Sequence, residues 1–424
     1  MRARAFLERL FQAAVASVQP EAALGDALPD PPPGRTVVVG AGKGAAQLAR
    51  AVERRWPGPL SGVVVTRYGH GVPCRRIRVL EAAHPVPDAA GERASKEILR
   101  AVSGLGPDDL VLALITGGGS ALLAAPPEGL TLADEQALAR GLLASGAPIG
   151  VMNAIRREVS RIRGGRLARA AAPARVVSLI VSDVPGDDPA EVASGPTISP
   201  PIRRENVRRV VAAHGLVLPE QVAAFLAGED DPAPAPDDPA FARGDVRVIA
   251  SARVALEAAA AAAGAEGIPA VILSDAIEGE AREAGRVLAA IATEVARRAR
   301  PFTPPVVLLS GGETTVSLRG PAGQGGRNSE LLLAFAQAIE GVDGIVALAA
   351  DTDGIDGTAP EAGAFADGAS AGRMRAAGRD PAAALAGHES RAAFAAAGGL
   401  FAPGPTGTNV NDFRAILIAP GSAL

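Results

Sequence analysis

A glycine-rich segment with one lysine, GAGKG at residues 40–44, follows the short apolar run TVVV. Residues without bulky side chains let backbone N–H groups approach an anion closely, and an ammonium group adds a full positive charge. Lys43 and Lys96 are the only lysines among 42 basic residues. A compact ammonium at residue 43 therefore indicates a role that the larger, forked side chain of arginine cannot fill.

The segment that contains Lys43 also matches GxGxxA, a pattern typical of dinucleotide-binding turns. Bound NAD would require an acidic residue about 20 residues further on to hold its ribose. The sequence has no Asp or Glu between Glu53 and Glu81, so NAD is disfavoured. NADPH stays open, with Arg67 near its 2′-phosphate, and a tight turn with an exposed lysine is the structural alternative.

A second glycine-rich segment, TGGGS at residues 116–120, follows the apolar run LVLALI. Three successive glycines and a serine hydroxyl at a helix start provide several donors for an anion. Ser120 as a nucleophile would require the pattern GxSxG, which is absent here. We therefore expect the phosphates of a nucleotide to be bound by Gly42, Gly117, Gly118, Gly119 and Ser120.

The second half of the chain contains a third glycine segment and an isolated arginine. SGGE at residues 310–313 follows PVVLL, and Arg327 comes directly after two glycines at the expected start of a helix. Arginine binds carboxylates and phosphates through two parallel hydrogen bonds, so Arg327 is a candidate anion clamp. The remaining residues predicted to contact a nucleotide are Gly311, Gly312, Glu313 and, in the polar loop GPTGTNVND, Asn409.

Acidic residues follow two further apolar runs: SDVPGDD contains Asp183 and Asp187, and DTDGIDG contains Asp351 and Asp353. One cysteine and four histidines offer no zinc-site spacing, so any metal should be a hard cation with oxygen ligands, such as Mg²⁺. Asp183, Asp187 and Asp351 are predicted to hold it. An acid beside a phosphate loop can alternatively act as a general base toward a hydroxyl. His84, in AAHPVPD, is interpreted as a turn residue.

These residues together describe phosphoryl transfer without a Walker motif, because that chemistry consists mainly of positioning and charge neutralisation. Short apolar runs alternate with helical stretches, which predicts α/β architecture with parallel, doubly wound sheets covered by helices on both faces. The expected strands are residues 36–40, 62–66, 110–116, 176–182, 246–250, 269–273, 305–310, 345–350 and 415–419. The expected helices are residues 44–55, 89–103, 132–145, 153–171, 279–299 and 328–340.

A length of 424 residues favours two domains. The stretch GEDDPAPAPDDPAFAR, at residues 228–243, is rich in Pro and Asp and can form neither a helix nor a central strand. We therefore expect an N-terminal α/β lobe at residues 1–235 and a C-terminal α/β lobe at residues 236–424.

Composition disfavours several classes of partner. A net charge of −4 without a dense basic run disfavours binding to nucleic acid. No apolar run approaches the roughly 18 to 20 residues that span a bilayer. The first residues carry Glu8 and Glu21 and read as an amphipathic helix rather than a signal peptide. The chain is therefore expected to be a cytoplasmic protein without a membrane partner.

Nine motifs, in order over nearly the whole chain, jointly resemble the glycerate 2-kinase family, whose C-terminal region is called MOFRL and whose members are often labelled hydroxypyruvate reductases. They are GAGKG (40–44), HPVPD (84–88), TGGGSALL (116–123), MNAIRREVSRIRGGRLA (152–168), SDVPGDDPAEVASGPT (182–197), SGGETTV (310–316), GGRNSE (325–330), DTDGIDG (351–357) and GPTGTNVND (404–412). The resemblance implies ATP-dependent phosphorylation of D-glycerate at its 2-hydroxyl, with Mg²⁺, in a cleft between two Rossmann-like lobes.

The same resemblance places the family's essential lysine, arginine and aspartate on Lys43, Arg327 and Asp353. Lys43 and Arg327 would neutralise the transferring phosphoryl group or the glycerate carboxylate, and Asp353 would orient or deprotonate the attacking hydroxyl. Asp351 stands where the family usually has glycine, which leaves Asp351 as the alternative to Asp353. A homodimer is a further expectation.

Two other functions stay open at this point. NADPH-dependent reduction of hydroxypyruvate is supported by GxGxxA and opposed by the absence of a ribose-binding acid. A non-catalytic protein that binds a nucleotide or an organic acid would keep the glycine segments. Such a protein would not need Lys43, Arg327 and Asp353 together.

Overall fold

The computed structural model describes residues 2–199, 204–228, 232–318 and 323–420, which form two compact units. The N-terminal unit comprises Ala23–Ser182 and Asp187–Ile249, and the C-terminal unit comprises Met1–Ala22, Asp183–Gly186 and Ala250–Leu424. The expected boundary at residue 235 differs from this division, because the first 22 residues group with the C-terminal unit. The described part of the chain contains no helix long and apolar enough to cross a membrane.

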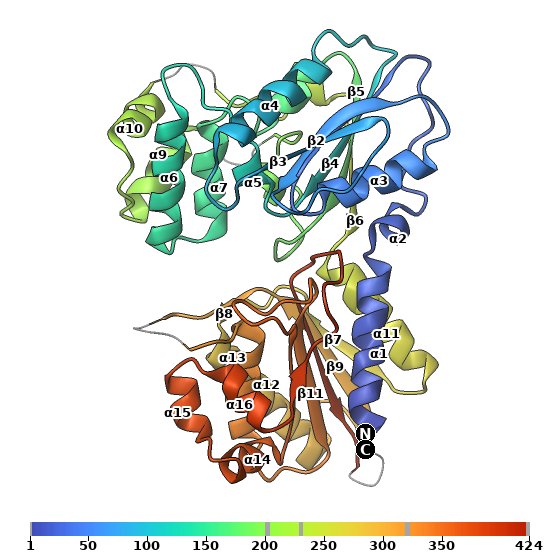
Figure 1. Cartoon of the computed structure of the whole chain (residues 1–424), viewed down its shortest axis with the longest axis vertical. Helices are drawn as coiled ribbons and strands as arrows, with labels where there is room; N and C mark the ends of the chain where they lie inside the picture. Colours follow the sequence, from blue (N-terminus) through green and yellow to red (C-terminus); the bar gives the residue numbers. More distant parts are fainter. Residues whose placement is uncertain (1, 200–203, 229–231, 319–322, 421–424) are drawn as a thin grey trace. The chain divides into compact units, whose positions relative to one another are not determined.

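A six-stranded sheet with the order β3-β2-β1-β4-β5-β6 forms the centre of the N-terminal unit (Figure 1). Its strands are β1 (Thr36–Ala41), β2 (Ser61–Arg67), β3 (Ile77–Ala82), β4 (Leu110–Thr116), β5 (Arg175–Val181) and β6 (Asp245–Ala250). The pairs β1–β2, β1–β4, β2–β3 and β4–β5 are parallel. This is the strand order of dinucleotide-binding Rossmann folds, so the predicted architecture is confirmed for this unit.

Helices cover both faces of this sheet because its crossovers run in opposite directions. The connection through α3 (Ala45–Arg55) leads from β1 to β2, and the connection through α4 (Ala89–Val102) leads from β3 back past β1 to β4. Right-handed crossovers that run in opposite directions place their helices on opposite faces of a sheet. On the α3 face, Leu48 and Val52 belong to a buried cluster with Val38, Val64 and Leu112.

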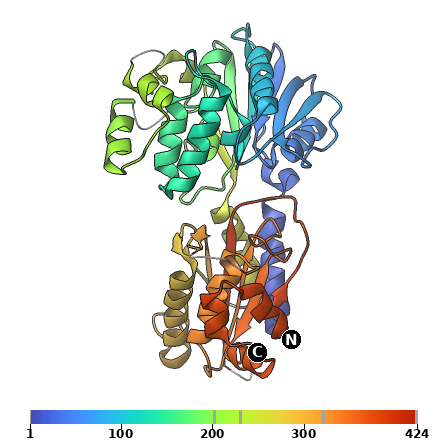
Figure 2. The same cartoon turned by 60° about the vertical axis from the view of Figure 1, so that its left-hand side comes forward.

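Four further helices of the N-terminal unit form a separate apolar cluster, visible in Figure 2 as the green helices. They are α6 (Leu132–Ser145), α7 (Ile149–Glu158), α9 (Arg204–Ala213) and α10 (Glu220–Ala227). Their shared core consists of Leu138, Leu142, Ile155, Val159, Val207, Val222 and Leu226. The other helices here are α5 (Gly119–Leu122), α8 (Arg166–Ala171) and α2 (Pro20–Leu24), which spans the division between the units.

The single helix predicted at residues 153–171 is wrong. The chain forms α7 and α8 instead, with a turn between them. The first helix, α7, ends at Glu158, and Gly164 and Gly165, directly before α8, adopt positive φ angles of 61° and 81° that a continuous right-handed helix does not contain. Ser160 stabilises the turn, because its Oγ accepts hydrogen bonds from the backbone N–H groups of residues 162 and 163.

The C-terminal unit contains a second six-stranded sheet, with the order β13-β12-β11-β14-β9-β7. Its strands are β7 (Ala270–Ser274), β9 (Val306–Gly312), β11 (Ile345–Asp351), β12 (Gly363–Asp367), β13 (Leu400–Phe401) and β14 (Asp412–Ile418). The pair β7–β9 is parallel, but β9–β14, β14–β11, β11–β12 and β12–β13 are antiparallel. The predicted parallel sheet is therefore wrong for this unit. Helices cover both faces, so its strands are apolar on both sides whatever their direction.

In the C-terminal unit, α1 (Arg2–Ser17) and α11 (Ala252–Ala265) lie against one face of the sheet, and α12 (Ala281–Arg298) and α13 (Arg327–Ala338) lie against the other (Figure 1). Phe11 of α1 is buried, and its ring centroid lies 5.0 Å from that of Phe401 and 5.7 Å from that of Phe413. The predicted N-terminal amphipathic helix is thus part of a core. The remaining elements are α14 (Ser370–Ala376), α15 (Pro381–Ala386), α16 (Ser390–Ala396), β8 (Gly279–Glu280) and β10 (Thr314–Thr315).

Candidate active site

Two glycine-rich loops meet at the carboxyl ends of β1 and β4 in the N-terminal unit. These neighbouring strands connect to opposite sides of the sheet, the position at which open α/β sheets bind ligands. The backbone N–H of Lys43 donates to the carbonyl oxygen of Gly117 at 2.8 Å, and that of Gly44 donates to Thr116 Oγ1 at 3.1 Å. The structure therefore brings Lys43 and the predicted loop of residues 117–120 together.

Two glycines in these loops have different tasks. Gly42 has a φ of +135°, and a Cβ atom there would lie only 2.1 Å from Thr116 Oγ1. Gly118 has a φ of +77°, and a Cβ atom there would lie 3.1 Å from both His84 Nε2 and Lys43 Cγ. Gly42 thus permits the close approach of the backbones, whereas Gly118 permits His84 and Lys43 to lie close to the loop.

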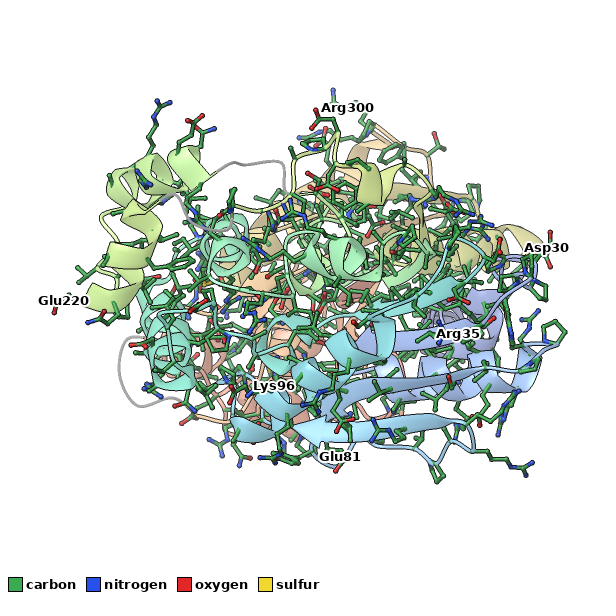
Figure 3. The ribbon with its side chains drawn as sticks, turned by 90° about the horizontal axis from the view of Figure 1, so that it is seen from above. Asp30, Arg35, Glu81, Lys96, Glu220 and Arg300 are labelled. Atoms are coloured by element: carbon green, nitrogen blue, oxygen red, sulfur yellow. The ribbon has the colours of Figure 1, made fainter. Side chains whose placement is uncertain are left out.

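The two lysines of the chain have contrasting surroundings. The ammonium group of Lys96, on α4 (Figure 3), donates to Glu92 Oε1 at 2.7 Å, and the Lys96 side chain is 58% exposed. Lys43 is half-buried, and within the described ranges its ammonium group has no ion-pair partner. Lys96 therefore forms an ordinary ion pair on the surface of a helix, whereas the charge of Lys43 is available to a ligand.

His84, which the sequence analysis interprets as a turn residue, lies beside Lys43 and Gly118. Burial lowers the pKa of its imidazole to about 4, and the charges of Lys43, Arg67 and Arg156 add to this effect. The ring is therefore neutral near pH 7 and has one N–H to donate. Its position depends on β3, which ends two residues earlier and which the sequence analysis does not predict.

Hydrogen bonds connect Ser120 with Arg156 of α7. Ser120 Oγ and Ser194 Oγ are 2.7 Å apart. Asn153 Oδ1 accepts hydrogen bonds from Ser194 Oγ at 3.2 Å and from Arg156 Nη1 at 3.3 Å. The partner of the Ser120 hydroxyl is thus another hydroxyl rather than a histidine or a carboxylate, which favours anion binding over a nucleophilic role.

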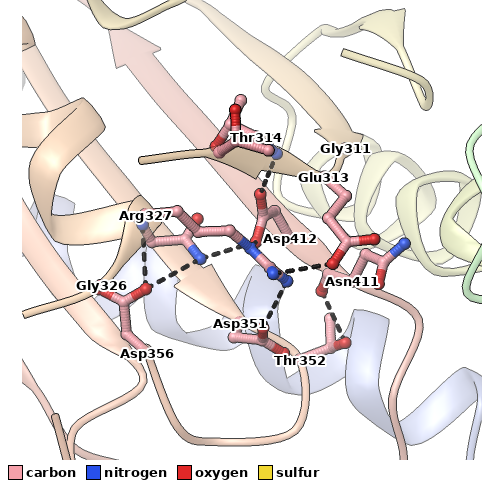
Figure 4. Close-up of polar contacts among 12 residues, drawn as sticks. Gly311, Glu313, Thr314, Gly326, Arg327, Asp351, Thr352, Asp356, Asn411 and Asp412 are labelled. Carbon is pink, nitrogen blue, oxygen red and sulfur yellow. Dashed lines mark hydrogen bonds and ion pairs between the residues drawn. The ribbon is translucent and has the colours of Figure 1, made fainter. Parts of the chain in front are cut away.

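Arg327, at the start of α13, contacts three carboxylates of the C-terminal unit (Figure 4). Its Nε donates to Asp412 Oδ1 at 2.7 Å, its Nη1 to Glu313 Oε1 at 2.9 Å and its Nη2 to Asp351 Oδ2 at 2.8 Å. Burial disfavours the charge on this side chain, but the three carboxylates outweigh burial and raise the pKa of Arg327. Each guanidinium nitrogen thus meets a protein carboxylate, where the sequence analysis expects an external anion.

Asp412 and Asp351 respond differently to their common neighbour Arg327. Asp412 is buried and also accepts hydrogen bonds from Arg414 and, at 2.7 Å, from Asn328 Nδ2. Burial alone would raise the pKa of Asp412, but Arg414 and Arg327 hold it below its usual value. Burial raises the pKa of Asp351 well above its usual value, although Arg327 counteracts this effect. Asp351 is therefore the easier of the two to protonate.

Asp356, the last acid of DTDGIDG, caps the helix that carries Arg327. It is buried, and it accepts hydrogen bonds from the backbone N–H groups of Asn328 and Ser329, both at 2.9 Å. Ser329 Oγ also donates to it at 2.7 Å. These donors are among those that a helix leaves unsatisfied at its N-terminus, so Asp356 fixes the start of α13.

Asp353, the middle acid of DTDGIDG, differs from its neighbours. It is half-buried, and its Oδ1 accepts a hydrogen bond from the backbone N–H of Ile355 at 2.8 Å. Within the described ranges its Oδ2 has no hydrogen-bond partner. In Asp351, by contrast, Oδ2 accepts from Arg327 and Oδ1 accepts from the backbone N–H of Asp353 at 3.0 Å. Asp353 is therefore the acid with an oxygen available to a substrate.

The other residues predicted to contact a nucleotide in the C-terminal unit have structural partners. Gly311 and Gly312 end β9, and a Cβ atom on Gly312 would lie 2.3 Å from the backbone nitrogen of Ile277. Asn409 Oδ1 accepts a hydrogen bond from the backbone N–H of Asn411 at 2.9 Å, a local turn. These contacts explain the residue types without a ligand, so nucleotide binding here stays a prediction.

The three predicted metal ligands belong to different units. Asp183 and Asp351 group with the C-terminal unit, and Asp187 groups with the N-terminal unit. The main-chain oxygen of Asp183 accepts a hydrogen bond from Asn411 Nδ2. Among the described residues, no group of three or more His, Cys, Asp or Glu side chains is arranged to hold a metal ion.

The matches to known proteins extend over both units of the chain. A family model described as a domain of unknown function, DUF4147, matches residues 6–227, and the MOFRL family model matches residues 306–412. An Agrobacterium vitis protein named as a hydroxypyruvate reductase is 53% identical over 98% of this chain and 94% of its own. The glycerate 2-kinase of Pyrococcus horikoshii is 39% identical over 89% of this chain and 86% of its own. The crystal structure of a Thermotoga maritima glycerate kinase, 36% identical, matches with a TM-score of 0.89 over 99% of this chain and 100% of its own.

Proposed function

Since the chain belongs to the glycerate 2-kinase family, we propose that it transfers the γ-phosphoryl group of ATP to the 2-hydroxyl of D-glycerate. The products are 2-phosphoglycerate and ADP. The relatives named glycerate kinases support this reaction. The observation that carries the proposal is the Lys43 ammonium, which lies beside a glycine-rich loop without an ion-pair partner in the described chain. Phosphoryl transfer depends on such fixed positive charges.

In the proposed reaction, the 2-hydroxyl oxygen forms a bond to the γ-phosphorus. The bond between that phosphorus and the oxygen bridging it to the β-phosphate breaks, and ADP leaves with the electron pair. The hydroxyl proton passes to Asp353, whose Oδ2 has no hydrogen-bond partner within the described residues. Lys43 neutralises charge on the transferring phosphoryl group or on the glycerate carboxylate.

Arg327 has a positioning role in this proposal. Its ion pair with Asp351 stabilises the start of the loop that carries Asp353, and its ion pair with Glu313 holds the guanidinium group in place. Nη1 and Nη2 each carry a second N–H, so contact with a substrate anion is compatible with this role. The residue thereby connects the carboxylate cluster to the acid that receives the proton.

The residues around Asp351 do not fit a resident magnesium ion. Both oxygens of Asp351 accept hydrogen bonds, from Arg327 and from the backbone of Asp353. We therefore expect Mg²⁺ to be bound mainly by the phosphates of ATP and not by Asp351. Magnesium, a homodimer and a cytoplasmic location stay predictions.

Two observations favour a second candidate function, the NADPH-dependent reduction of hydroxypyruvate. The sheet order of the N-terminal unit is that of dinucleotide-binding folds, and the Agrobacterium vitis relative carries the reductase name. Arg67 ends β2, where a 2′-phosphate would lie in such a complex. The Lys43 ammonium, which has no ion-pair partner among the described residues, has no comparable task in hydride transfer, so we place the kinase first.

The experiment that tests the kinase is a coupled assay of ADP release with ATP, Mg²⁺ and D-glycerate, in which phosphorus NMR identifies the product. We expect 2-phosphoglycerate from the parent protein. Lys43→Ala should lower kcat/KM by about 10²-fold or more, because it removes a fixed charge from the transition state. Lys96→Ala is the matched control and should change kcat/KM less than about twofold, since its ion pair is exposed.

Three outcomes would contradict parts of the proposal. A 3-phosphoglycerate signal would keep the kinase and overturn its regiochemistry. Equal activity of Lys43→Ala and Lys96→Ala would remove Lys43 from the mechanism. Consumption of NADPH on hydroxypyruvate, with no ADP release on glycerate, would establish the reductase instead.

A further inference from the structure

We propose that His84 and Arg156 bind, together with Lys43, an oxyanion of one substrate at the glycine-rich loop of the N-terminal unit. The identity of the substrates rests on the proposed function. The oxyanion is either the carboxylate of D-glycerate or a phosphate of ATP. Sequence motifs indicate Lys43 and the loop, but they assign no ligand contact to His84 or Arg156.

His84 and Lys43 both lie close to Gly118. A Cβ atom on Gly118 would lie 3.1 Å from both His84 Nε2 and Lys43 Cγ, so an imidazole nitrogen and the lysine stem border the same point. Both side chains are half-buried, and neither has a hydrogen-bond or ion-pair partner on its side-chain nitrogens within the described chain. Two polar groups without partners at one glycine indicate a site for a ligand.

A chain of hydrogen bonds connects Arg156 with the same loop. Arg156 Nη1 shares Asn153 Oδ1 with Ser194 Oγ, and Ser194 Oγ lies 2.7 Å from Ser120 Oγ. Ser120 follows Gly118 by two residues, so three hydrogen bonds connect the guanidinium with the loop. Asn153 and Ser194 are both buried, which fixes this connection.

The adjacent arginines Arg156 and Arg157 differ in their ion-pair partners. Arg157 is 1% exposed and forms an ion pair with Glu191, so its charge is neutralised by the protein. Arg156 has only the contact with the Asn153 amide in the described structure, and no carboxylate pairs with it. Burial lowers the pKa of Arg156 to about 10, the neighbouring charge of Arg163 adds to this effect, and the charge of Glu135 offsets it only in part. A bound anion would offset both costs.

The charged side chains that act on His84 are all cationic. Lys43, Arg67 and Arg156 all act on His84 in the same direction, which shows that positive potential predominates around the ring. The charge of Arg67 is partly directed elsewhere, because its Nε donates to His70 at 2.5 Å. A neutral His84 can donate one N–H to an anion without adding to the repulsion among these cations. An anion would then meet three kinds of group: the compact charge of Lys43, the neutral N–H donor of His84 and the planar guanidinium of Arg156.

Steady-state kinetics of Arg156→Gln and His84→Gln test the proposal. Each variant should raise KM for one substrate by about 10- to 100-fold, the loss of one hydrogen bond to a charged group, and leave the other KM within about twofold. An increase for D-glycerate assigns the oxyanion to its carboxylate, and an increase for ATP assigns it to a phosphate. Arg156→Lys should restore part of the loss, because it returns the charge without the fork.

Arg161→Gln is the matched control, since Arg161 is exposed and lies five residues further along the chain. Both KM values should stay at parent levels in this variant. Calorimetric titration of each variant with D-glycerate and with ADP, separately, measures binding without turnover. If the parent shows no kinase activity, these titrations still test the site, and the proposed function alone fails. Unchanged KM and unchanged affinities in folded Arg156→Gln and His84→Gln would overturn the inference.

Discussion

Asp351 and Asp353 are identical side chains two positions apart, yet the structure gives them different chemistry. Asp351 is buried against Arg327, and both of its oxygens accept hydrogen bonds. Asp353 is half-buried and has one oxygen without a hydrogen-bond partner among the described residues. The extra acid that the chain has in place of a glycine thus belongs to the ion-pair cluster, and Asp353 is the residue that we propose as the general base.

Substitution of these two acids separates catalysis from stability. Asp353→Asn should lower kcat by about 10²- to 10⁴-fold, the usual contribution of a general base, with little change in melting temperature. Asp351→Asn should lower the melting temperature, because it removes a charge that faces Arg327, and should reduce kcat less. Kinetics at saturating substrates and calorimetry measure the two effects. The opposite pattern of kcat losses would assign the base to Asp351.

Sequence motifs predict part of this residue-level picture. They identify Lys43 and the glycine loops, because an isolated lysine and clustered glycines stand out in this composition. Arg156 does not stand out among 42 basic residues. Its environment depends on Asn153 and Ser194, which are 41 residues apart and meet only in the folded unit. Contacts of that kind leave no local pattern in a sequence.

Strands and helices position the side chains of the site, which lie at or near the ends of these elements. Each of the nine predicted strands is present, because buried runs of Val, Leu and Ile are readily recognised. Strand β3 is missed because it lies at the sheet edge, where IRVLEA mixes apolar with exposed charged residues. Because β3 is not predicted from the sequence, the position of His84 is not predicted either. The antiparallel pairing of β9, β14 and β11 is missed because apolar strands look alike in either direction.

The cap on α13 offers a test at the level of one helix. Asp356→Ala should destabilise the fold by about 1–3 kcal/mol, since it removes a helix cap and leaves buried N–H donors unsatisfied. Activity should fall as well, because Arg327 is the first residue of that helix. Chemical denaturation and the coupled assay measure the two losses.

Asp380→Ala provides the comparison for that cap. Asp380 accepts hydrogen bonds from the backbone N–H groups of Ala382 and Ala383 at the start of α15, but it is exposed. Its loss should lower stability by about 1 kcal/mol or less and leave kcat at the parent value. A loss of activity equal to that of Asp356→Ala would show that α13 has no special part in the site.

The molecule as a whole consists of one unit with a parallel sheet and one with a mixed sheet, and the first helix belongs to the second of them. The Pro- and Asp-rich stretch at residues 228–243 predicts the neighbourhood of the division, but composition cannot predict that the chain's first residues join the C-terminal unit. That arrangement depends on aromatic packing between Phe11, Phe401 and Phe413. Only the fold brings these three rings together.

Phe11→Ala tests this division at the scale of the units. The variant should destabilise the C-terminal unit by about 3–5 kcal/mol, the usual cost of removing a buried phenylalanine side chain. Hydrogen exchange should accelerate in β11 and β14 and stay unchanged in β1 and β4. Arg9→Ala, which removes an exposed ion pair with Glu266 directly after α11, should cost less than about 1 kcal/mol. Faster exchange in β1 and β4 would contradict the division.

The membership of α1 in the C-terminal unit sets an order of events during synthesis on the ribosome. The first helix emerges before any residue of the N-terminal unit, but α11 and β14, against which it packs, emerge only after residue 250 and after residue 410. The nascent chain therefore carries an amphipathic helix with an uncovered apolar face while the parallel sheet completes. Maturation of the C-terminal unit has to wait for the last strand, so a chain truncated before residue 412 would keep α11 but lack β14, one of the elements against which its first helix packs.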